Sequence, residues 1–435
     1  MKFSYNWICE LVEGVDTPPK ELGELITMKT AECEGVEAYG AHLAQVCAAR
    51  VIKAEPIPGK KNKKVEVETG RYGLRTVVCG APNCREGMTT AYAPAGTKLG
   101  EVELQVAEIN GVLSDGMLAS GAELGINRDA AGILEIEGKP GDPVPGCAAD
   151  YIIEIDNKSL THRPDLWGHH GMAREVAAIL RKPLRDPVNE ALLPEGEPDI
   201  EVRIEDFDLC PRYSALTFDN VTVGPSPLWM QYRLESLGLN PISNIVDVTN
   251  YVLCEIAEPM HAFDRATLHG NTIFVRRAGE GEFITALNGE TYKLDPENLV
   301  IADARGPVAI GGVMGGLDTG VVGNTTAIVL EAANFHAANI RKTSSRLKLR
   351  TDASMRFEKA QDPRSTVRGL ARALELFRQV CPGMRLTGGV ADVKREFPAL
   401  PQIALHMDWL IRKLGRPIDK AEVKEILTSL AFGVQ

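Results

Sequence analysis

The sequence contains no long hydrophobic run. Of its 435 residues 44% are hydrophobic and 25% are charged, and charge interrupts every apolar run well before the ~20 residues that a membrane helix needs. The opening residues, MKFSYNWICELVEGVD, contain acidic side chains and lack the apolar stretch of a secretory signal. We therefore expect a soluble cytoplasmic protein without membrane contact, built from about three domains at ~150 residues each.

Paired cysteines are also absent. The nine cysteines never form a C-x-x-C pair and never lie beside two suitably spaced histidines. This pattern argues against a zinc site and against a disulfide framework, and it favours free thiols in a reducing compartment. His162, His169 and His170 lie close together in sequence, but adjacent side chains point apart on most backbones. We therefore predict no metal site.

Positive charge is scarce over the chain as a whole. Forty-eight basic residues against 59 acidic ones give a net charge of −11, which excludes an indiscriminate binder of nucleic acid and leaves only local basic patches. The segment 341–359 has seven basic and two acidic residues. We predict that it contacts RNA phosphates, although a solvated helix face has the same composition; the residues proposed are Arg341, Lys342, Arg346, Lys348 and Arg350.

Local patterns divide the chain into blocks. Residues 1 to about 38 carry two helical patterns, and residues 39–149 carry short strands separated by glycines. The strands include Thr76–Cys79 and the alternating run Val102–Val106, and one short helical insert is expected near Gly121–Gly125. This arrangement predicts a small Greek-key barrel of the OB type. Lys60, Lys61, Lys63 and Lys64 fall in one of its loops, where we expect a solvated turn.

Strands and helices mix irregularly in the second half of the chain, which predicts an α+β multidomain protein. A strand at Tyr151–Asp156 and a helix at Gly171–Leu180 precede a polar linker, and the irregular mixture follows from residue 200 to about 395. Two amphipathic helices occupy the last forty residues. Because two helices alone bury too little surface, we expect the chain to stop inside a domain.

Several segments, in order along the chain, resemble the β chain of bacterial phenylalanine-tRNA ligase. The resemblance is carried by Val77–Asn83, Asn110–Met117, Thr161–Asp165, Asn244–Tyr251, Pro259–Asp264, Gly311–Gly316 and Leu349–Ser354. It implies a discontinuous N-terminal domain (1–38 and 150–199) and an inserted OB-type tRNA-binding-like domain (39–149). It also implies an editing domain of the B3/B4 type (200–395) and the truncated start of a B5-type winged-helix-like domain (400–435).

The resemblance also implies a function. In the family an α chain uses ATP and Mg²⁺ to attach phenylalanine to tRNA(Phe), and the β chain hydrolyses mischarged Tyr-tRNA(Phe). We expect the aminoacylation site on the α chain, an (αβ)2 heterotetramer, and no cofactor bound by this part of the β chain. Two alternatives stay open: a non-enzymatic tRNA-binding module and a free-standing deacylase that edits in trans.

Tyrosine differs from phenylalanine by one hydroxyl group, which an apolar pocket cannot strongly reject. An editing site therefore needs a buried acceptor for the phenol proton, and Glu331, expected at the end of the strand Ala327–Leu330, is predicted to supply it. His261 is predicted to orient the attacking water or to polarise the ester. Asn250 completes the predicted catalytic set. Each of these residues also has an ordinary structural interpretation, as a strand-end glutamate, a packed histidine or a turn asparagine.

The remaining predicted site residues bind the substrate. Thr249 and Asn250 are expected to follow a valine-rich strand and to hold the ester and ribose. Gly315 and Gly316 belong to a glycine-rich segment whose amides could stabilise an oxyanion, although tight packing at a corner explains these glycines nearly as well. Thr351 and Ala353 match positions that line the family's amino-acid pocket, where a small side chain leaves room for an aromatic ring.

Overall fold

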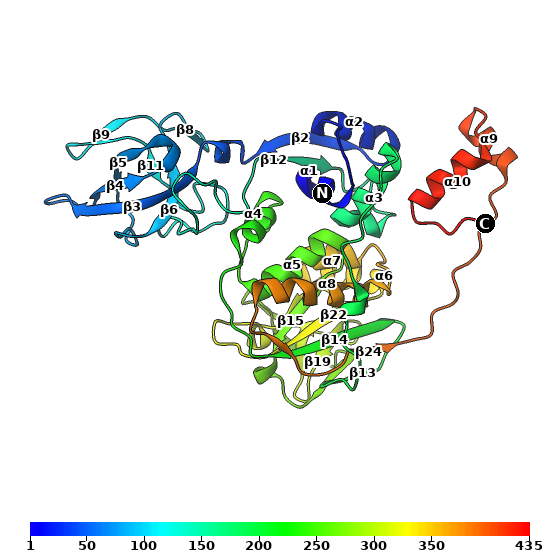
Figure 1. Ribbon diagram of the computed structural model, residues 1–435. Coiled ribbons are helices and arrows are strands. Elements are labelled where there is room, and N and C mark those ends of the chain that lie inside the picture. The colour runs from blue at the N-terminus through cyan, green and yellow to red at the C-terminus, as the bar shows by residue number, and fades with distance from the viewer.

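A computed structural model describes residues 1–435 and shows several distinct units (Figure 1). A barrel-like unit projects to one side, the N-terminal helices lie above a large unit, and two terminal helices stand apart at the end of an extended segment. No helix is long and apolar enough to cross a membrane. The helices are α1 (Tyr5–Leu11), α2 (Pro19–Lys29), α3 (His169–Leu180), α4 (Leu228–Ser236), α5 (Asn244–Ile256), α6 (Ala337–Leu347), α7 (Asp352–Phe357), α8 (Ser365–Val380), α9 (Met407–Leu414) and α10 (Lys420–Ser429).

A three-stranded sheet joins segments from both sides of the barrel unit. Its antiparallel order is β1 (Lys2–Ser4), β12 (Asp150–Ile155) and β2 (Cys33–Tyr39). His169 supports this sheet from α3: its Nε2 accepts the Ser4 N–H at 2.9 Å and its Nδ1 lies 2.8 Å from the Cys254 carbonyl. Both ring nitrogens are therefore engaged in structural contacts.

The barrel unit is built on one antiparallel sheet whose two edges meet. The strands β11 and β5 lie at opposite ends of the sheet, and the Asp115 N–H donates to the Thr76 carbonyl at 2.9 Å, which links the two edges. In order, the sheet contains β11 (Met117–Leu118), β6 (Thr89–Ala93), β3 (Cys47–Pro56), β4 (Lys63–Glu68) and β5 (Leu74–Cys79). Four short strands form two hairpins beside it: β7 (Lys98–Leu99) with β8 (Val102–Glu103), and β9 (Ala107–Ile109) with β10 (Val112–Ser114).

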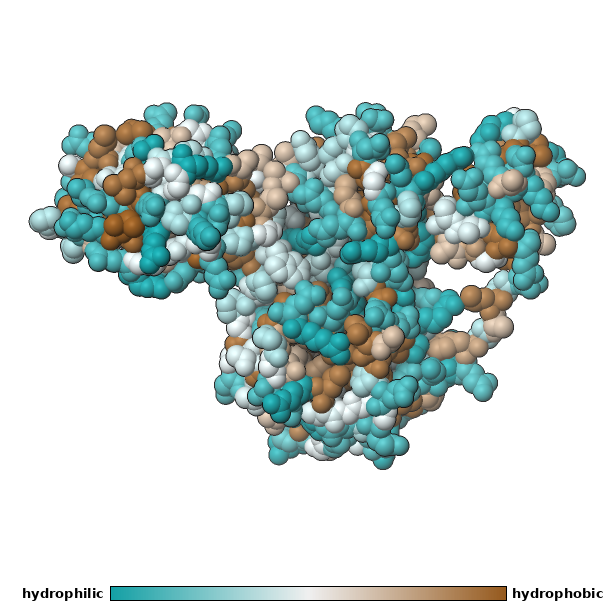
Figure 2. All heavy atoms as spheres, viewed as in Figure 1, coloured by the Kyte–Doolittle hydropathy of each residue, from teal (hydrophilic) through white to brown (hydrophobic).

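Two local predictions for this unit are wrong. The run Val102–Val106 forms a strand only at its first two residues, and Gly121–Gly125 forms turns in place of a helix. The Ser120 backbone N–H donates to Glu123 Oε2 at 2.7 Å and the Glu123 N–H donates to the Ser120 hydroxyl at 3.2 Å, but the single turn that these bonds cap is not continued into a helix. Figure 2 shows apolar patches on the surface of this unit, and its exposed large hydrophobic residues include Leu74, Val102, Val106, Ile109 and Leu113.

The large unit contains two five-stranded sheets. The helix-covered sheet has the order β15 (Met260–Asp264), β22 (Ile328–Asn334), β14 (Arg212–Asp219) and β23 (Arg385–Leu386), with β24 (Ala391–Lys394) also paired to β14. The second sheet has the order β13 (Glu201–Ile204), β16 (Thr272–Arg277), β19 (Leu299–Ala302), β20 (Pro307–Ile310) and β21 (Met314–Gly315). A hairpin, β17 (Phe283–Thr285) with β18 (Thr291–Lys293), packs beside β20.

The two faces of the helix-covered sheet belong to different cores. Ile328, Leu330 and Ala332 of β22 join a core of 39 residues that includes α5, α8 and the N-terminal helices. Val329 and Ala333 join a core of 27 residues shared with the second sheet. Side chains alternate across a strand, so Glu331 faces the second sheet. The N-terminal helices and the large unit thus share one apolar core, although the sequence predicts a linker between them.

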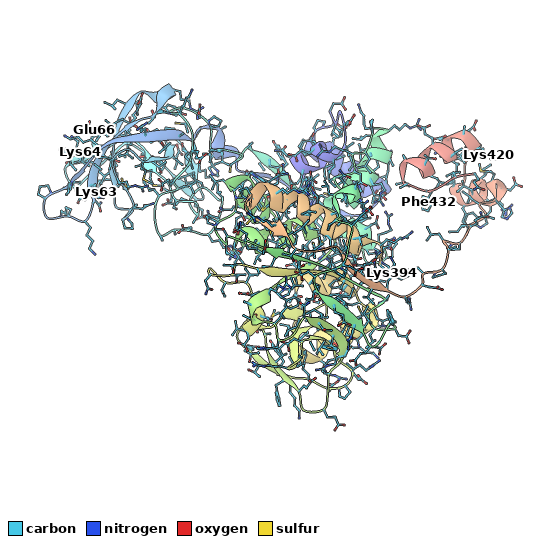
Figure 3. All side chains as sticks on the ribbon, turned by 60° about the horizontal axis from the view of Figure 1, so that its bottom comes forward. Lys63, Lys64, Glu66, Lys394, Lys420 and Phe432 are labelled. Atoms are coloured by element: carbon cyan, nitrogen blue, oxygen red, sulfur yellow. The ribbon has the colours of Figure 1, made fainter.

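The terminal helices have few contacts with the rest of the chain. Figure 3 shows Lys394 at the start of the extended segment and Lys420 and Phe432 in the terminal helical part, while Lys63, Lys64 and Glu66 mark the barrel unit at the opposite end. Glu422 of α10 lies 3.5 Å from Arg181, which follows α3. Arg181 is exposed and Glu422 is half-buried, and an ion pair this open to solvent contributes little to stability.

Candidate functional site

His261 and Glu331 lie directly opposite each other on the paired strands β15 and β22. The next strand, β14, places Ala215 opposite Glu331 on its other side. Tyr213 lies two residues from Ala215 and therefore on the same face. Strand pairing thus gathers three polar side chains on the face between the two sheets, within an otherwise apolar core.

Glu331 is buried, with only 7% of its surface exposed. It lies inside β22, not at a strand end as the sequence suggested, because the strand continues to Asn334. Tyr213, which is fully buried, donates its hydroxyl to Glu331 Oε2 at 2.8 Å. Burial raises the pKa of Glu331 to about 7, and the hydrogen bond from Tyr213 opposes this rise. No protein group donates to the other carboxylate oxygen, Oε1.

His261 is a neutral imidazole with an unused nitrogen. Burial lowers its pKa to about 4, and its Nε2 is buried without a hydrogen-bond partner. The ring packs edge-on against Phe263, with centroids 4.5 Å apart. Gly315 faces the ring from β21: a Cβ atom there would lie 2.4 Å from His261 Cε1. A side chain at position 315 would therefore displace the imidazole.

A cavity of about 80 Å³ opens between these groups. Its polar side chains are His261 and Glu331, and the rest of its wall is apolar or backbone. The other lining residues are Pro259, Met260, Ile301, Ala309, Ile310, Gly312, Val313, Met314, Gly315, Ala353 and Phe357. The predicted residues His261, Glu331, Gly315 and Ala353 therefore meet in one cavity.

Thr351 lies outside the cavity but fixes one of its walls. It is the N-cap of α7 and forms a capping box with Ser354. Its hydroxyl donates to the Val313 carbonyl at 2.7 Å, which ties α7 to the glycine-rich segment. Ala353 is the second residue of α7. Thr351 thus positions Ala353 and Val313 and does not itself line the cavity.

Thr249 and Asn250 are not brought to this cavity. The sequence places them after a strand, but Asn244–Ile256 forms the helix α5, which Ser243 caps through its hydroxyl. The α5 helix packs in the core on the opposite side of the helix-covered sheet from Glu331. The Thr249 hydroxyl donates to the Val246 carbonyl at 2.7 Å. A valine-rich run can be helical when its apolar residues pack on one face, and tertiary packing decides between the two structures here.

Backbone hydrogen bonds to the neighbouring strands hold the glycine-rich segment 311–316 in place. The Gly316 N–H donates to the Val308 carbonyl at 2.8 Å and the Gly311 N–H donates to the Leu299 carbonyl at 2.9 Å. A Cβ atom on Gly316 would approach the Val308 carbonyl oxygen to 2.6 Å. These two amides are therefore not available to an oxyanion, and close packing accounts for both glycines.

In the folded chain, ion pairs neutralise part of the positive charge of the basic segment around α6. Arg346 pairs with Asp295 and Glu297, and Arg350 pairs with Glu358. The acids at 295 and 297 come from a loop outside the segment. Three of the five predicted RNA-contacting residues, Arg341, Lys342 and Lys348, are exposed and have no ion-pair partner.

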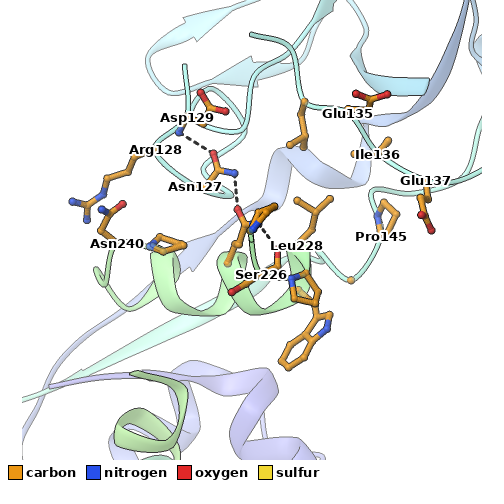
Figure 4. A pocket seen from close by; sticks show the side chains of 17 residues that line it. Asn127, Arg128, Asp129, Glu135, Ile136, Glu137, Pro145, Ser226, Leu228 and Asn240 are labelled. Atoms are coloured by element: carbon orange, nitrogen blue, oxygen red, sulfur yellow. Dashed lines mark hydrogen bonds between the residues drawn. The ribbon is translucent and has the colours of Figure 1, made fainter. Parts of the chain in front are cut away.

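A larger cleft of about 740 Å³ lies between the barrel unit and α4 (Figure 4). Asn127 crosses it, donating its amide to Gln231 Oε1 at 2.7 Å. Arg128, the one cation in its lining, pairs with Glu235 at 3.2 Å. The cleft contains prolines, carboxylates and Trp229 but no buried reactive group, so the cavity at Glu331 is the stronger candidate for chemistry.

Comparisons with known proteins find two matching domain models and several relatives of this chain. A model described as "B3/4 domain" matches residues 209–382, and one described as "Putative tRNA binding domain" matches residues 46–143. A phenylalanine--tRNA ligase beta subunit from Solibacter usitatus is 62% identical over 434 residues, covering 100% of this chain and 55% of that protein. One from Anaeromyxobacter dehalogenans is 39% identical over 443 residues, covering 99% and 54%.

Over its whole length the chain is similar to phenylalanine--tRNA ligase beta subunits. It spans about half the length of the curated relatives it matches. A crystal structure of an N-terminal fragment of the beta subunit from Pyrococcus horikoshii is 13% identical with a TM-score of 0.31, covering 68% of this chain and 79% of that one. The segment 209–382 that matches the B3/4 model contains Tyr213 and every residue that lines the cavity at Glu331.

Sequence reasoning missed Tyr213, the group in closest polar contact with Glu331. The run Arg212–Phe218 is rich in β-branched and aromatic residues, which is typical of a strand. That signal could have located β14, but not its pairing with β22. Met260, Met314 and Phe357 of the cavity wall were missed for the same reason, since they come from separate elements.

Proposed function

We propose that this chain carries the editing site of a phenylalanine-tRNA ligase and hydrolyses tyrosine wrongly attached to tRNA(Phe), in an assembly with an α subunit. The observation that carries the proposal is the cavity in which a buried carboxylate with one unoccupied oxygen faces a neutral imidazole with an unoccupied nitrogen. The Nε2 atom of His261 is buried without a partner, and such atoms are uncommon. A ligand that supplies the missing bond is the simplest account of it.

The carboxylate supplies selectivity. The phenol group of a tyrosyl ester would donate to Glu331 Oε1, whereas a phenylalanyl ester would cover that oxygen and leave it without a partner. Leaving a buried charged group unsatisfied costs about 1–3 kcal/mol or more. This cost corresponds to a factor of roughly 5 to 150 in relative rate.

The imidazole supplies positioning. His261 lies beside Glu331 and is neutral at physiological pH because its pKa is about 4. Its Nε2 can therefore accept a proton from a water molecule that attacks the ester carbonyl. The bond between the carbonyl carbon and the ribose oxygen breaks, tyrosine leaves as the free amino acid, and the 3′-terminal hydroxyl of the tRNA regains its proton.

The cavity must widen to admit the ring. It holds about 80 Å³, whereas a cavity of roughly 150 Å³ accommodates benzene. Met260 and Met314 line it, and methionine side chains adapt readily to a new occupant. Movement of these two side chains is the opening step in this proposal.

The decisive experiment uses the full-length β chain co-purified with its α subunit. Deacylation of Tyr-tRNA(Phe) and Phe-tRNA(Phe) is measured for the unmodified assembly and for Glu331→Ala. We expect the unmodified assembly to prefer the tyrosyl ester and Glu331→Ala to lose that preference. Equal hydrolysis of both esters by the unmodified assembly would refute the proposal.

In the whole enzyme, we propose that the β chain works together with an α subunit. An α subunit would carry the aminoacylation site and use ATP and Mg²⁺, and an (αβ)2 heterotetramer would be the working assembly. Nine free cysteines are compatible with a cytoplasmic setting. The match to the tRNA-binding model supports a second candidate function, in which residues 46–143 bind RNA without catalysis; RNA binding without any deacylation by the assembly would favour it.

A further inference from the structure

Tyr213 is in direct contact with Glu331 but is too deep to touch a substrate. Its side chain is fully buried in the core between the two sheets and does not line the cavity. Its only polar partner is Glu331 Oε2, at 2.8 Å. A buried hydroxyl that satisfies one oxygen of a buried carboxylate both fixes the orientation of that carboxylate and stabilises its charge.

We infer that Tyr213 is a positioning residue that sets the specificity of the site, by holding Glu331 as a charged acceptor with Oε1 turned toward the cavity. This inference rests on the proposed editing function and names a residue through which that function is tuned. The phenol of Tyr213 occupies one carboxylate oxygen, and the phenol of a tyrosyl substrate would occupy the other.

Three of the other titratable groups around Glu331, namely Tyr213, Cys210 and His261, stay uncharged near neutral pH. Burial raises the pKa of Tyr213 and that of Cys210 well above their usual values, so both keep their protons. The pKa of Glu258 is also raised well above its usual value, and that of His261 is lowered to about 4. No charged side chain reaches the cavity from the second sheet or from α7.

Glu331 itself has a pKa of about 7, because burial raises it from its usual range. The hydrogen bond from Tyr213 favours its charged form, against the effect of burial. Without that bond the carboxyl would stay protonated to higher pH. A protonated Glu331 is neutral, so the penalty for leaving it unpaired beside a phenylalanyl ester falls, and discrimination between the two esters falls with it.

The test replaces only the hydroxyl, with Tyr213→Phe. The ratio of deacylation rates for Tyr-tRNA(Phe) and Phe-tRNA(Phe) is measured from pH 6 to 9 in the assembly with the α subunit. We expect the ratio to rise with pH in the unmodified protein, and the midpoint of that rise to move upward by about one pH unit in Tyr213→Phe, since each hydrogen bond to a carboxylate lowers its pKa by roughly that much.

A matched control separates this effect from a loss of stability. Tyr232 is also buried and its hydroxyl donates to the Ala148 carbonyl at 2.7 Å, far from Glu331 in the fold. Tyr232→Phe should leave the midpoint unchanged. In a Glu331→Gln background, Tyr213→Phe should produce no pH shift at all, because the titrating group is absent.

A second measurement does not depend on activity. The carboxyl pKa of Glu331 is followed in the full 435-residue chain by infrared difference spectroscopy, with Glu331→Gln identifying its band. An upward shift in Tyr213→Phe supports the inference, and an unchanged pKa overturns it. If the unmodified assembly prefers tyrosine but Tyr213→Phe has the same midpoint, the inference fails and the proposed function stands; if the unmodified assembly shows no preference, the proposed function itself fails.

Discussion

His261 and Glu331 form a cross-strand pair on β15 and β22, on the face that looks toward the second sheet. Side chains directly opposite on antiparallel strands have Cβ atoms about 4.5–5.5 Å apart. The backbone hydrogen bonds of the sheet therefore fix the separation of an imidazole and a carboxyl without any loop. This rigidity suits a site that must distinguish two substrates by one oxygen atom.

The first prediction concerns Gly315, against which the imidazole packs. Gly315→Ala places a Cβ atom 2.4 Å from His261 Cε1 by the native geometry, so the ring must move. We expect deacylation of Tyr-tRNA(Phe) to fall at least about tenfold, which corresponds to about 1.4 kcal/mol in the barrier. Gly323→Ala is the control, because a Cβ atom there meets nothing within 4 Å. Full activity in Gly315→Ala would contradict the placement of His261 at the reacting atoms.

The second prediction is a pH dependence of stability. The pKa of Glu331 is raised from 4.5 to about 7 in the folded chain, so the folded state holds more protons than the unfolded state between these values. Stability therefore falls as pH rises through this window. Glu331→Gln removes the effect, and it should gain on the order of 2–3 kcal/mol relative to the unmodified chain between pH 5 and pH 8.

Denaturant unfolding of the two chains at both pH values measures this difference. The comparison between variants cancels the titration of other groups. A difference in unfolding free energy that does not vary with pH would show that Glu331 titrates normally.

A third prediction concerns the buried ion pair between α5 and α8. Glu255 is 1% exposed, and Arg372 contacts both of its carboxylate oxygens, at 2.5 and 3.0 Å. Arg372→Met leaves a buried carboxylate without its charged partner, and should cost about 3–5 kcal/mol of stability. Arg364→Met is the control, because Arg364 pairs with Asp362 at the surface, where about 0–1 kcal/mol is expected. Similar losses in thermal unfolding for both variants would contradict this account.

A fourth prediction concerns RNA. Arg341, Lys342 and Lys348 are exposed without ion pairs, whereas Arg346 and Arg350 are paired with acids. Replacing the three unpaired residues by alanine should weaken tRNA binding and reduce the slope of log affinity against log salt by up to about 2 to 3, at roughly 0.7–0.9 for each phosphate contact. Replacing Arg346 and Arg350 should change the slope less. If both sets reduce the slope equally, the ion pairs do not shield those residues from RNA.

The pattern of residues along the chain was sufficient to predict several helices and strands and the resemblance to the family. Helical spacing located α1, α2 and α8, alternation located β4, and a buried-looking apolar run located β5. The irregular order of strands and helices indicated α+β structure. Ordered motifs indicated the family, which the comparisons confirm. These features depend on local periodicity and on residue identity, which a sequence states directly.

Tertiary structure decided how the site is assembled. Asn244–Tyr251 has the composition of a strand or of a buried helix, and only packing against α8 and the helix-covered sheet makes it helical, which removes Thr249 and Asn250 from the cavity. The ion pairs of Arg346 join residues 49 and 51 positions apart in sequence. Tyr213 meets Glu331 across 118 positions, because two strands pair in one register. Register depends on which faces are buried against which neighbours, and no local segment contains that information.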